Sequence, residues 1–473
     1  MRVLLINSPI PVSYYNREYY LPSSLLYLAS VLEKNGEEVK ILDLKCAKYE
    51  IPDNPYKHYG NIIIDTISDF GPDLIGFGCL FSGNFPDILR FSVSIKKKYP
   101  IIPIVIGGIH PTIYPKEIMA NCPSIDWIVL GEGEETIVKL INTVKTGRYD
   151  FDQIDGFAFR NNGTIVVNPK TTYIKELDTI PFPAYHLVSF KDYYEDTSKW
   201  HNPKELSFKT SIPIITSRSC PNRCSFCSMF MVMGPKWRDR SPQNVVDEIE
   251  YVYSKYNQNH FSFMDDNLTL KKSHVLEICN QILKRKLNIQ FETPSGISIK
   301  SLDEEVLDAL VSAGLVRVSL AIESGSDFIR NKIMKKHLSK QKIYEIVHLA
   351  KRYKHLYIKA FFIIGLPEET HETLSETYHM IQEINVDRVY LQNIVPFPGT
   401  EVFKQALRDN LLVDINPETL YKSDALYLTN YSRYFIKPYQ LDLKDLQKFR
   451  DKCDSLIEEQ NADKKMLIKR LHN

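Results

Sequence analysis

Three cysteines stand close together in one short stretch of the chain and constrain its fold and chemistry more than any other feature. Cys220, Cys224 and Cys227 have the spacing C-x3-C-x2-C and follow an apolar, strand-like run at 212–215. Cysteine thiolates at such short spacings hold iron–sulfur clusters, because one compact loop can wrap the cube. A [4Fe–4S] cube has one more iron than this loop has thiols, so one iron is open to a ligand that is not protein.

Other uses of these cysteines fit the sequence less well. A zinc site needs a fourth Cys or His at matching spacing, and the next cysteine, Cys279, lies far along the chain. Disulfides are disfavoured because the N-terminus reads as a first strand and not as a secretory signal. Three purely structural thiols remain as an alternative, but the preceding strand and the motifs that follow favour a cluster.

The spacing resembles that of the radical S-adenosylmethionine (SAM) superfamily. In that superfamily, the amino and carboxylate groups of SAM chelate the open iron. The resemblance implies that a reduced cluster splits SAM into methionine and a 5′-deoxyadenosyl radical.

Composition limits the remaining possibilities. A chain of 473 residues is long enough for two or three domains. The 59 basic and 58 acidic side chains give a net charge of +1, which argues against a dominant nucleic-acid surface. No apolar run approaches the ~20 residues that span a bilayer. Eight cysteines without a secretory signal predict a reducing cytoplasm, and an exposed cluster needs protection from oxygen.

The first third of the chain alternates strands with helices, which predicts βαβ units and a doubly wound parallel sheet. The expected strands are 3–7, 39–42, 74–78, 104–106 and 127–130, and the expected helices are 23–35, 62–69 and 85–98. Ligands of such sheets bind at the carboxyl ends of the strands. No G-x-G-x-x-G follows the first strand, so a dinucleotide site is unsupported.

Glycine-rich motifs follow the expected strands at 78–83, 107–112 and 131–136, where glycines allow a bulky ligand to approach the backbone. With Asn7-Ser-Pro9 and the helix start at 21–29, these motifs resemble the cobalamin-binding domain of one radical SAM class. The resemblance implies a cobalamin site lined by Gly107, Gly108, His110, Thr112, Glu132 and Gly133. The D-x-H-x-x-G signature of cobalt ligation is absent, so His110 is expected to line the site rather than bind cobalt. A degenerate, empty Rossmann-like domain remains the alternative.

The expected domains are a B12-binding-like Rossmann domain at 1–145, a connector with a hairpin at 146–205, a radical SAM core at 206–425 and a helical extension at 426–473. In the core, six βα units predict a partial (β/α)6 TIM-like barrel with its chemistry at the carboxyl strand ends. The expected strands end in polar motifs at 265–267, 295–298, 323–325 and 365–369. The predicted fold class is therefore α/β in both domains.

Resemblance to the same superfamily suggests which core residues hold SAM. The expected set is Phe226, Asp265, Asp266, Ser295, Glu323, Ser324 and Gly365. Glu323 and Ser324 match a position that contacts ribose and methionine, Phe226 and Gly365 match adenine contacts, and Asp265 and Asp266 match an acceptor of the amino group. A turn and helix cap is the simpler interpretation of 265–267. For Lys335 and Lys336, a SAM carboxylate contact competes with a solvated helical face, and alternation places Tyr390 and Gln392 towards the lumen.

The resulting functional hypothesis is a cobalamin-dependent radical SAM methyltransferase acting on an unactivated carbon. In this hypothesis the radical removes hydrogen from that carbon, methylcobalamin delivers the methyl group, and a second SAM remethylates the corrinoid. A cyclisation or rearrangement without methyl transfer is the alternative, and a SAM or cobalamin sensor is a lesser one. The cofactors would be the cluster, SAM and cobalamin. The substrate is not readable from the sequence, and a reducing partner such as flavodoxin or ferredoxin is expected.

Overall fold

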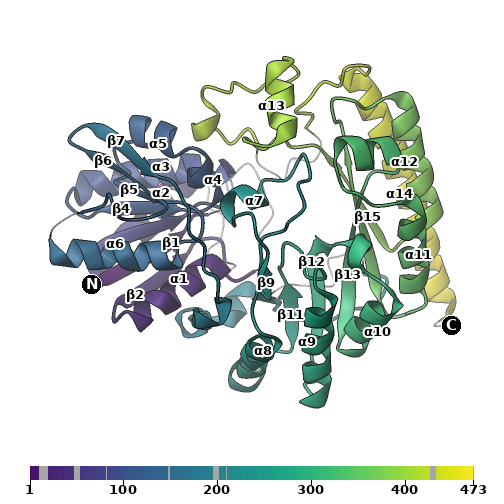
Figure 1. Ribbon diagram of the computed structural model, residues 1–473, viewed down its shortest axis with the longest axis horizontal. Coiled ribbons are helices and arrows are strands. Elements are labelled where there is room, and N and C mark those ends of the chain that lie inside the picture. The colour runs from purple at the N-terminus through teal and green to yellow at the C-terminus, as the bar shows by residue number, and fades with distance from the viewer. Residues whose placement is uncertain are drawn as a thin grey trace. The chain divides into compact units, whose positions relative to one another are not determined.

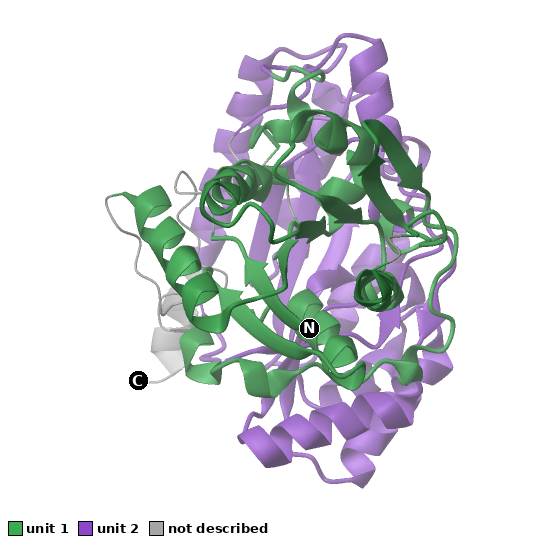
Figure 2. Ribbon diagram, turned by 90° about the vertical axis from the view of Figure 1, so that its left-hand side faces the viewer, with its two compact units in different colours: residues 1–194, 231–234, 415–430 green, residues 195–230, 235–414, 431–473 purple. Residues whose placement is uncertain are grey.

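The computed structural model divides the chain into two compact units, which are coloured separately in Figure 2. Unit 1 comprises residues 1–194, 231–234 and 415–430, and unit 2 comprises residues 195–230, 235–414 and 431–473. The residues that the structure describes are 1–9, 20–46, 54–80, 82–147, 150–194, 202–208, 210–426 and 433–471. Phe81, in the first glycine-rich motif, lies outside them.

Unit 1 is built on one seven-stranded sheet of order β2-β1-β3-β4-β5-β6-β7. Its first five strands are parallel, and β6 and β7 are added antiparallel at one edge. The strands are β1 (Arg2–Asn7), β2 (Glu38–Asp43), β3 (Leu74–Gly78), β4 (Ile104–Gly107), β5 (Trp127–Val129), β6 (Phe157–Asn161) and β7 (Thr164–Asn168). Because β2 and β3 lie on opposite sides of β1, the crossovers reverse between β1 and β3, which is the point where such sheets bind ligands.

Helices cover both faces of this sheet (Figure 1), which confirms the doubly wound prediction. One core packs α2 (Pro55–Phe70) and α3 (Phe85–Lys98) against the sheet, and the other packs α1 (Ser23–Lys34) and α6 (Glu134–Thr146). Two short helices, α4 (Ile109–Ile113) and α5 (Pro115–Asn121), follow β4 where only a turn was predicted. Pro115 starts α5, as proline's fixed φ favours.

The predicted connector does not stand apart from unit 1. Its hairpin was predicted correctly, but β6 pairs with β5 along Trp127–Val129 and so extends the sheet. Phe157 and Phe159 of this hairpin join the core that contains α1 and α6. Because burial of these rings ties the hairpin to the sheet, unit 1 continues to Tyr194, beyond the expected boundary at 145.

Unit 2 contains a six-stranded parallel sheet whose strands follow one another in sequence order, β8-β11-β12-β13-β14-β15. The strands are β8 (Ile212–Ile214), β11 (His260–Phe263), β12 (Gln290–Ile297), β13 (Leu315–Glu323), β14 (Tyr357–Ile364) and β15 (Arg388–Asn393). The helices between them are α8 (Pro242–Tyr256), α9 (Lys272–Lys284), α10 (Glu304–Ser312), α11 (Lys340–Lys351) and α12 (His371–Ile384). This arrangement (Figure 1) is the predicted partial TIM-like barrel.

Local sequence explains where these helices begin. Ser241 caps α8 by accepting a hydrogen bond from the Asn244 backbone, with Pro242 at the first position. Asp303, Ser339 and Thr370 cap α10, α11 and α12 in the same way. Each cap satisfies a backbone N–H that the first helical turn leaves without a partner.

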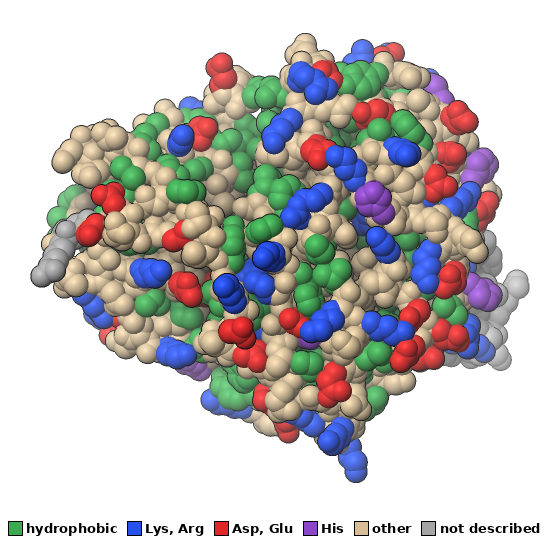
Figure 3. Space-filling view, viewed as in Figure 1, with side chains coloured by type: hydrophobic (Ala, Val, Ile, Leu, Met, Phe, Trp, Pro, Cys, Tyr) green, Lys and Arg blue, Asp and Glu red, His purple; other side chains and the backbone are tan. Residues whose placement is uncertain are grey.

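The C-terminal helix α14 (Leu443–Leu471) packs on β15 and α12. Arg450 donates to the carbonyl of Leu391 at 3.0 Å and to Asn393 Oδ1 at 2.7 Å, so it fastens the helix to the edge strand. Among the described residues no helix has both the length and the apolar character needed to cross a bilayer. Basic and acidic side chains are interspersed on the face in Figure 3, in keeping with the net charge of +1.

Candidate active site

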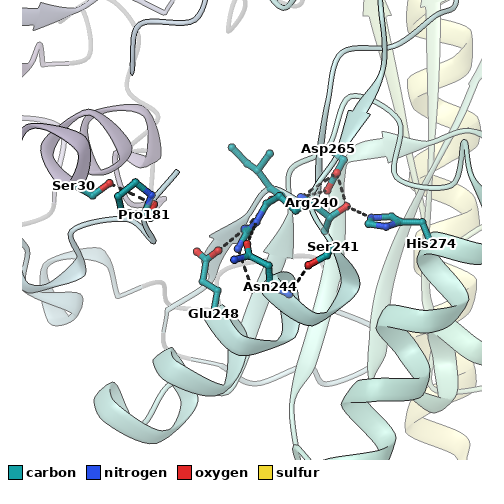
Figure 4. A network of polar contacts seen from close by, with 10 residues as sticks. Ser30, Pro181, Arg240, Ser241, Asn244, Glu248, Asp265 and His274 are labelled. Atoms are coloured by element: carbon teal, nitrogen blue, oxygen red, sulfur yellow. Dashed lines mark hydrogen bonds and ion pairs between the residues drawn. The ribbon is translucent and has the colours of Figure 1, made fainter. Parts of the chain in front are cut away.

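A buried carboxylate holds the segment of the chain that leads into the cysteine loop. Asp265, just after β11, accepts hydrogen bonds from Thr216 Oγ1 at 2.7 Å, Ser217 Oγ at 2.6 Å and the Thr216 backbone N–H at 3.1 Å. Arg240 donates to the Ile215 carbonyl and pairs with buried Glu248 of α8 (Figure 4). Burial raises the pKa of Asp265, and these donors oppose the shift. The contacts give Asp265 a bracing role in the strand that leads to Cys220.

The three thiols of the loop lie close together. Cys220, Cys224 and Cys227 are free and half-buried. Burial raises the pKa of the Cys227 thiol to about 11, and Cys224 and Cys220 raise it further through space, which places the three groups near one another. In the described part of the chain no three His, Cys, Asp or Glu side chains could share a single metal ion. A cube does not require that arrangement, because each thiolate binds a different iron.

Asp266 meets this loop from the end of β11. Its Oδ2 accepts the Ser219 backbone N–H at 2.8 Å. Ser219 has a φ of 71°, a left-handed conformation that is costly for a side chain other than glycine. Asp266 also raises the pKa of Cys227 through space. The residue predicted to receive the SAM amino group therefore lies beside the thiols.

An ion pair at the end of β13 completes the polar surroundings of the thiols. Lys336 Nζ lies 2.5 Å from Glu323 Oε1, and their side chains are 15% and 9% exposed. Burial opposes the charge of Lys336, but Glu323 and the thiols of Cys224 and Cys227 hold its pKa above the usual value. Glu323 has a φ of 74° and follows a register shift in the β13–β14 pairing. Such strain at a strand end is typical of functional positions.

Lys336 is not on a solvated helical face, because it lies in a loop and its side chain is only 15% exposed. A π-helical turn, Phe328–Ile333, precedes this loop, and π-turns are often found at functional sites. Arg330 is fully buried and donates to the Ser324 carbonyl at 2.6 Å and the Leu338 carbonyl at 2.7 Å, so it joins the chain before the π-turn to the chain after it. Lys335, its neighbour, is exposed and pairs with Glu401 at the surface.

Ser324 is buried and contacts α12. Its hydroxyl lies 3.3 Å from Thr377 Oγ1 of α12 and accepts the Ser326 backbone N–H at 3.1 Å. A side chain on Gly325 would meet the Glu376 carbonyl oxygen at 2.5 Å, so glycine allows the strand end to pack on α12. Ser324 thus fixes the position of Glu323, and its predicted contact with SAM stays a prediction.

Phe226 and Gly365 contact one hydrophobic cluster. Phe226 packs against the cluster that contains Leu366 and Ile394, and Gly365, with a φ of 88°, abuts Ile394. The Gly365 backbone N–H donates to Glu369 Oε2 at 2.7 Å, and burial raises the pKa of Glu369 to about 8. An apolar wall with a glycine turn suits one side of a planar adenine.

Ser295 stands in an irregular part of β12, where the pairing with β13 shifts register between Thr293 and Ile297. It is exposed, and its hydroxyl lies 4.0 Å from the sulfur of Met264. The structure thus brings Asp266 and Glu323 to the three thiols, whereas Asp265 and Ser324 brace the backbone. Two contributors were missed as site residues, Arg330 and Asn267. The buried role of Arg330 has no signal in the sequence.

Asn267 donates from Nδ2 to the sulfur of Cys220 at 3.4 Å. Hydrogen bonds to cluster sulfurs raise the reduction potential. Asn267→Leu keeps the volume but removes the donor, so we expect the potential to fall by a few tens of millivolts, the equivalent of about 1 kcal/mol. A redox titration followed by electron paramagnetic resonance (EPR) measures this, with exposed Asn280→Leu as the control. An unchanged potential in Asn267→Leu would exclude the contact.

The candidate corrinoid residues of unit 1 lie at the carboxyl ends of β4 and β5. Gly107 and Gly133 are half-exposed, and Gly108 has a φ of 119° with the Cys79 carbonyl against the place where a Cβ would be. Thr112 accepts the Gly131 backbone N–H at 2.9 Å, which ties the two turns together. Glu132 is buried and accepts the Ile174 backbone N–H at 3.0 Å. These strand ends offer accessible glycine backbone for a broad ligand.

His110 is a tether within unit 1. It is buried, with Nδ1 2.9 Å from Ser82 Oγ and Nε2 2.8 Å from the Tyr421 carbonyl oxygen. The Tyr421 carbonyl can only accept, so Nε2 donates to it, and in the neutral imidazole Nδ1 then accepts from the Ser82 hydroxyl. Both nitrogens are engaged within unit 1, and the expected place of His110 in the lining of the corrinoid site stays a prediction. The contact with Tyr421 holds the described part of its segment, 415–426, on α4.

Burial lowers the pKa of His110 to about 4 from a usual value of 6.5, with the bond to Tyr421 opposing the shift. The unfolded chain binds this proton more readily, so stability is present above pH 6.5 and falls as the pH falls towards 4. The linkage between protonation and folding gives a loss of about 3 kcal/mol in the free energy of unfolding across this pH range. We expect His110→Gln to flatten the loss of stability over that window in denaturant unfolding, unlike exposed His58→Gln. Retained hydroxocobalamin binding would support the tether, and its loss would favour a ligand.

Comparisons with known proteins match the two parts of the chain that contain these candidate residues. Residues 214–381 match the family described as the Radical SAM superfamily, and residues 17–141 match the B12 binding domain. The chain therefore contains a radical SAM domain and a B12-binding domain. The first range contains the cysteines, Asp266, Glu323 and Gly365, and the second contains the candidate corrinoid residues. The predicted cofactors, a [4Fe–4S] cluster, SAM and cobalamin, are confirmed for the two domains.

Relatives of this enzyme span most of its length. It is 28% identical over 450 residues to the cytidylyl-2-hydroxyethylphosphonate methyltransferase of Streptomyces wedmorensis, covering 88% of this chain and 82% of the relative. It is 27% identical over 435 residues to the anaerobic magnesium-protoporphyrin IX monomethyl ester cyclase of Rubrivivax gelatinosus, covering 88% and 74%. The methyltransferase TsrM from Kitasatospora setae, solved with cobalamin and a [4Fe–4S] cluster, superposes with a TM-score of 0.70 at 18% identity, covering 88% and 79%. The last comparison supports the fold.

Proposed function

We propose that this radical SAM enzyme cleaves SAM beside the cysteine loop and methylates an unactivated carbon of its substrate with the help of cobalamin. The observation that carries the proposal is the Glu323–Lys336 pair within electrostatic reach of the Cys224 and Cys227 thiols. SAM carries an ammonium, a carboxylate and ribose hydroxyls, and this pair offers both charges. The methyltransferase from Streptomyces wedmorensis supports methyl transfer as the outcome.

The chain's own residues have distinct tasks in this proposal. Cys220, Cys224 and Cys227 hold three irons, and Asp266 and Glu323 orient the SAM amino group and ribose. Lys336 neutralises the carboxylate, while Phe226 and the Gly365 turn bound the adenine. When bound, the cluster supplies the electron that cleaves SAM, and the corrinoid supplies the methyl group. Precise positioning is what converts such a cleavage into selective chemistry.

A low-potential electron donor and a reducing compartment belong to the same proposal. The eight cysteines are all free, as expected of a chain that works among reduced thiols. We therefore propose a flavodoxin or ferredoxin as the reducing partner and the cytoplasm as the compartment. Reduction of the cluster by purified flavodoxin, followed by EPR, tests the donor.

The reaction is tested with SAM that carries a deuterated methyl group. Anaerobically reconstituted enzyme with hydroxocobalamin, reductant and an extract of small molecules should yield 5′-deoxyadenosine, S-adenosylhomocysteine and a product with a deuterated methyl group. Methyl transfer consumes two SAM molecules per turnover, so the two nucleosides should appear in equal amounts.

A cyclisation or rearrangement is the second candidate, favoured by the similarity to the cyclase from Rubrivivax gelatinosus. It predicts 5′-deoxyadenosine without S-adenosylhomocysteine and a product without label. Bound SAM and corrinoid with neither nucleoside would instead indicate the sensor alternative.

A further inference from the structure

A fully buried carboxyl group is hydrogen bonded to the turn that follows β14. Glu369 Oε2 accepts the Gly365 backbone N–H at 2.7 Å, and the Glu369 backbone N–H donates to the Leu366 carbonyl oxygen at 3.1 Å. The other carboxyl oxygen, Oε1, is also buried and has no hydrogen-bond partner among the residues that the structure describes. A charged carboxylate would have one donor there, in a place that solvent does not reach, and such an arrangement is costly.

Capping of α12 does not account for this carboxyl group. Thr370 is the cap residue of that helix: its Oγ1 accepts the Thr373 backbone N–H at 3.3 Å, and its own backbone N–H donates to Thr373 Oγ1 at 3.0 Å. The start of the helix therefore has a capping box of its own. The carboxyl group of Glu369 is bonded instead to Gly365, which was predicted to contact the adenine of SAM.

The side chains that surround the turn are apolar. A Cβ on Gly365 would lie 3.6 Å from Ile394, which follows β15, and 3.7 Å from Leu446 of α14. Leu366 is fully buried in the same hydrophobic cluster as Ile394. Among such neighbours the neutral form of a carboxyl group is favoured over the charged form.

The ionisable groups of the neighbouring segments are paired elsewhere or exposed. The paired groups are Glu368 with Gln405 of α13 (Glu401–Arg408), Asp409 with Tyr439, Lys335 with Glu401, and Lys437 with Asp442. The exposed groups are His371 and Glu372 of α12, Lys404 of α13, and Lys444 and Lys448 of α14. Burial raises the pKa of Glu369 to about 8, and among the described residues only the hydrogen bond from Gly365 opposes the rise.

We propose that Glu369 is a positioning residue, a neutral carboxylic acid that holds the Gly365 turn where it bounds the adenine of SAM. The link to SAM rests on the proposed function, whereas the neutral state rests on burial and contacts. Oε1 carries the proton, because Oε2 is the oxygen that accepts the Gly365 N–H. An unpaired hydroxyl costs far less to bury than an unpaired charge.

The proton gives SAM binding a pH dependence of definite sign. Above the pKa of about 8, Glu369 ionises, and the charged group must gain water or another donor, which displaces the turn. If SAM binds only the neutral form, its affinity falls about tenfold between about pH 7 and about pH 9. In the unfolded chain the pKa is near 4.5, so the free energy of unfolding also falls as the pH rises from 4.5 towards 8.

Infrared difference spectroscopy on the anaerobic holoenzyme tests the neutral state without SAM or turnover. The spectrum of the wild type minus that of Glu369→Gln should contain the carbonyl band of a protonated carboxyl group at about pH 6 and lose it at about pH 10. Glu372→Gln, at an exposed position on α12, is the matched control and should give no such band at about pH 6. A carboxylate band from Glu369 at about pH 6 would overturn the proposal.

Equilibrium dialysis with labelled SAM tests the positioning role. Glu369→Gln should keep most of the affinity at about pH 7 and lose the tenfold fall, whereas Glu369→Ala should weaken SAM about tenfold throughout. Comparison with the glutamine variant also removes the titration of the SAM amino group, which both proteins share. Parallel pH profiles for the wild type and Glu369→Gln would refute the positioning role. The expected profile in an enzyme that makes no 5′-deoxyadenosine would refute the proposed function alone.

Discussion

Replacing Cys224 by alanine should lower the iron content from about four per chain to near zero and abolish 5′-deoxyadenosine formation, because two thiolates cannot retain an open cube. The loop itself should stay folded. Ser225 donates its backbone N–H to the Met334 carbonyl at 3.2 Å, and its own carbonyl accepts the Val402 N–H at 3.1 Å. Iron and sulfide analysis with the visible spectrum of reconstituted protein measures the loss.

Cys279→Ala is the matched control for that experiment. Cys279 is a buried thiol on α9, distant in sequence from the loop. Its loss leaves a small cavity that costs about 1 kcal/mol, but the iron content should be unchanged. If Cys224→Ala kept the cluster while Cys279→Ala lost it, the assignment of the three ligands would fail.

Glu323→Gln and Lys336→Met should each weaken SAM binding by tenfold or more, at least about 1.4 kcal/mol. The physical reason is the ion pair: each change removes one charge offered to SAM and leaves the partner charge uncompensated in a mostly buried place. The free energy of unfolding should also fall, by at most about 3 kcal/mol. The loss is limited because both groups keep some exposure to water. Equilibrium dialysis with labelled SAM on cluster-containing protein measures the affinity.

Lys335→Met separates the pair from its surroundings. Lys335 is adjacent in sequence but pairs with Glu401 at the surface, with side chains 43% and 56% exposed, so its loss should cost little. A double variant, Glu323→Gln with Lys336→Met, should be more stable than the sum of the two single losses. Equal SAM affinity in Lys336→Met and Lys335→Met would remove Lys336 from the site.

Patterns of short range predicted much of the fold. Strand–helix alternation predicted both sheets, and the bounds expected for β3 and α3 agree with the structure. The same alternation of strands and helices predicted that Glu323 lies at the end of β13. The carboxyl ends of parallel strands meet at one edge of the sheet, which is where such barrels carry their chemistry. The spacing of Cys220, Cys224 and Cys227 was enough to predict three neighbouring thiols, because the loop that joins them is local.

Long-range contacts decided what the sequence did not predict. Whether a polar side chain binds a ligand or braces the backbone depends on partners far along the chain, such as Thr216 for Asp265 and Thr377 for Ser324. Lys336 follows a π-turn, and no pattern of hydrophobic residues in the sequence predicts that turn. The segment near Tyr421, which belongs to unit 1 although it follows the barrel in sequence, depends on its bond with His110.

Reductive cleavage of SAM is the central claim and can be measured directly. Anaerobically reconstituted enzyme receives SAM and dithionite, and 5′-deoxyadenosine is quantified over time beside Cys224→Ala and Lys336→Met. We predict formation by the wild type, none by Cys224→Ala, and a higher SAM requirement for Lys336→Met. A wild-type protein that holds its cluster and binds SAM but forms no 5′-deoxyadenosine when reduced would contradict the account.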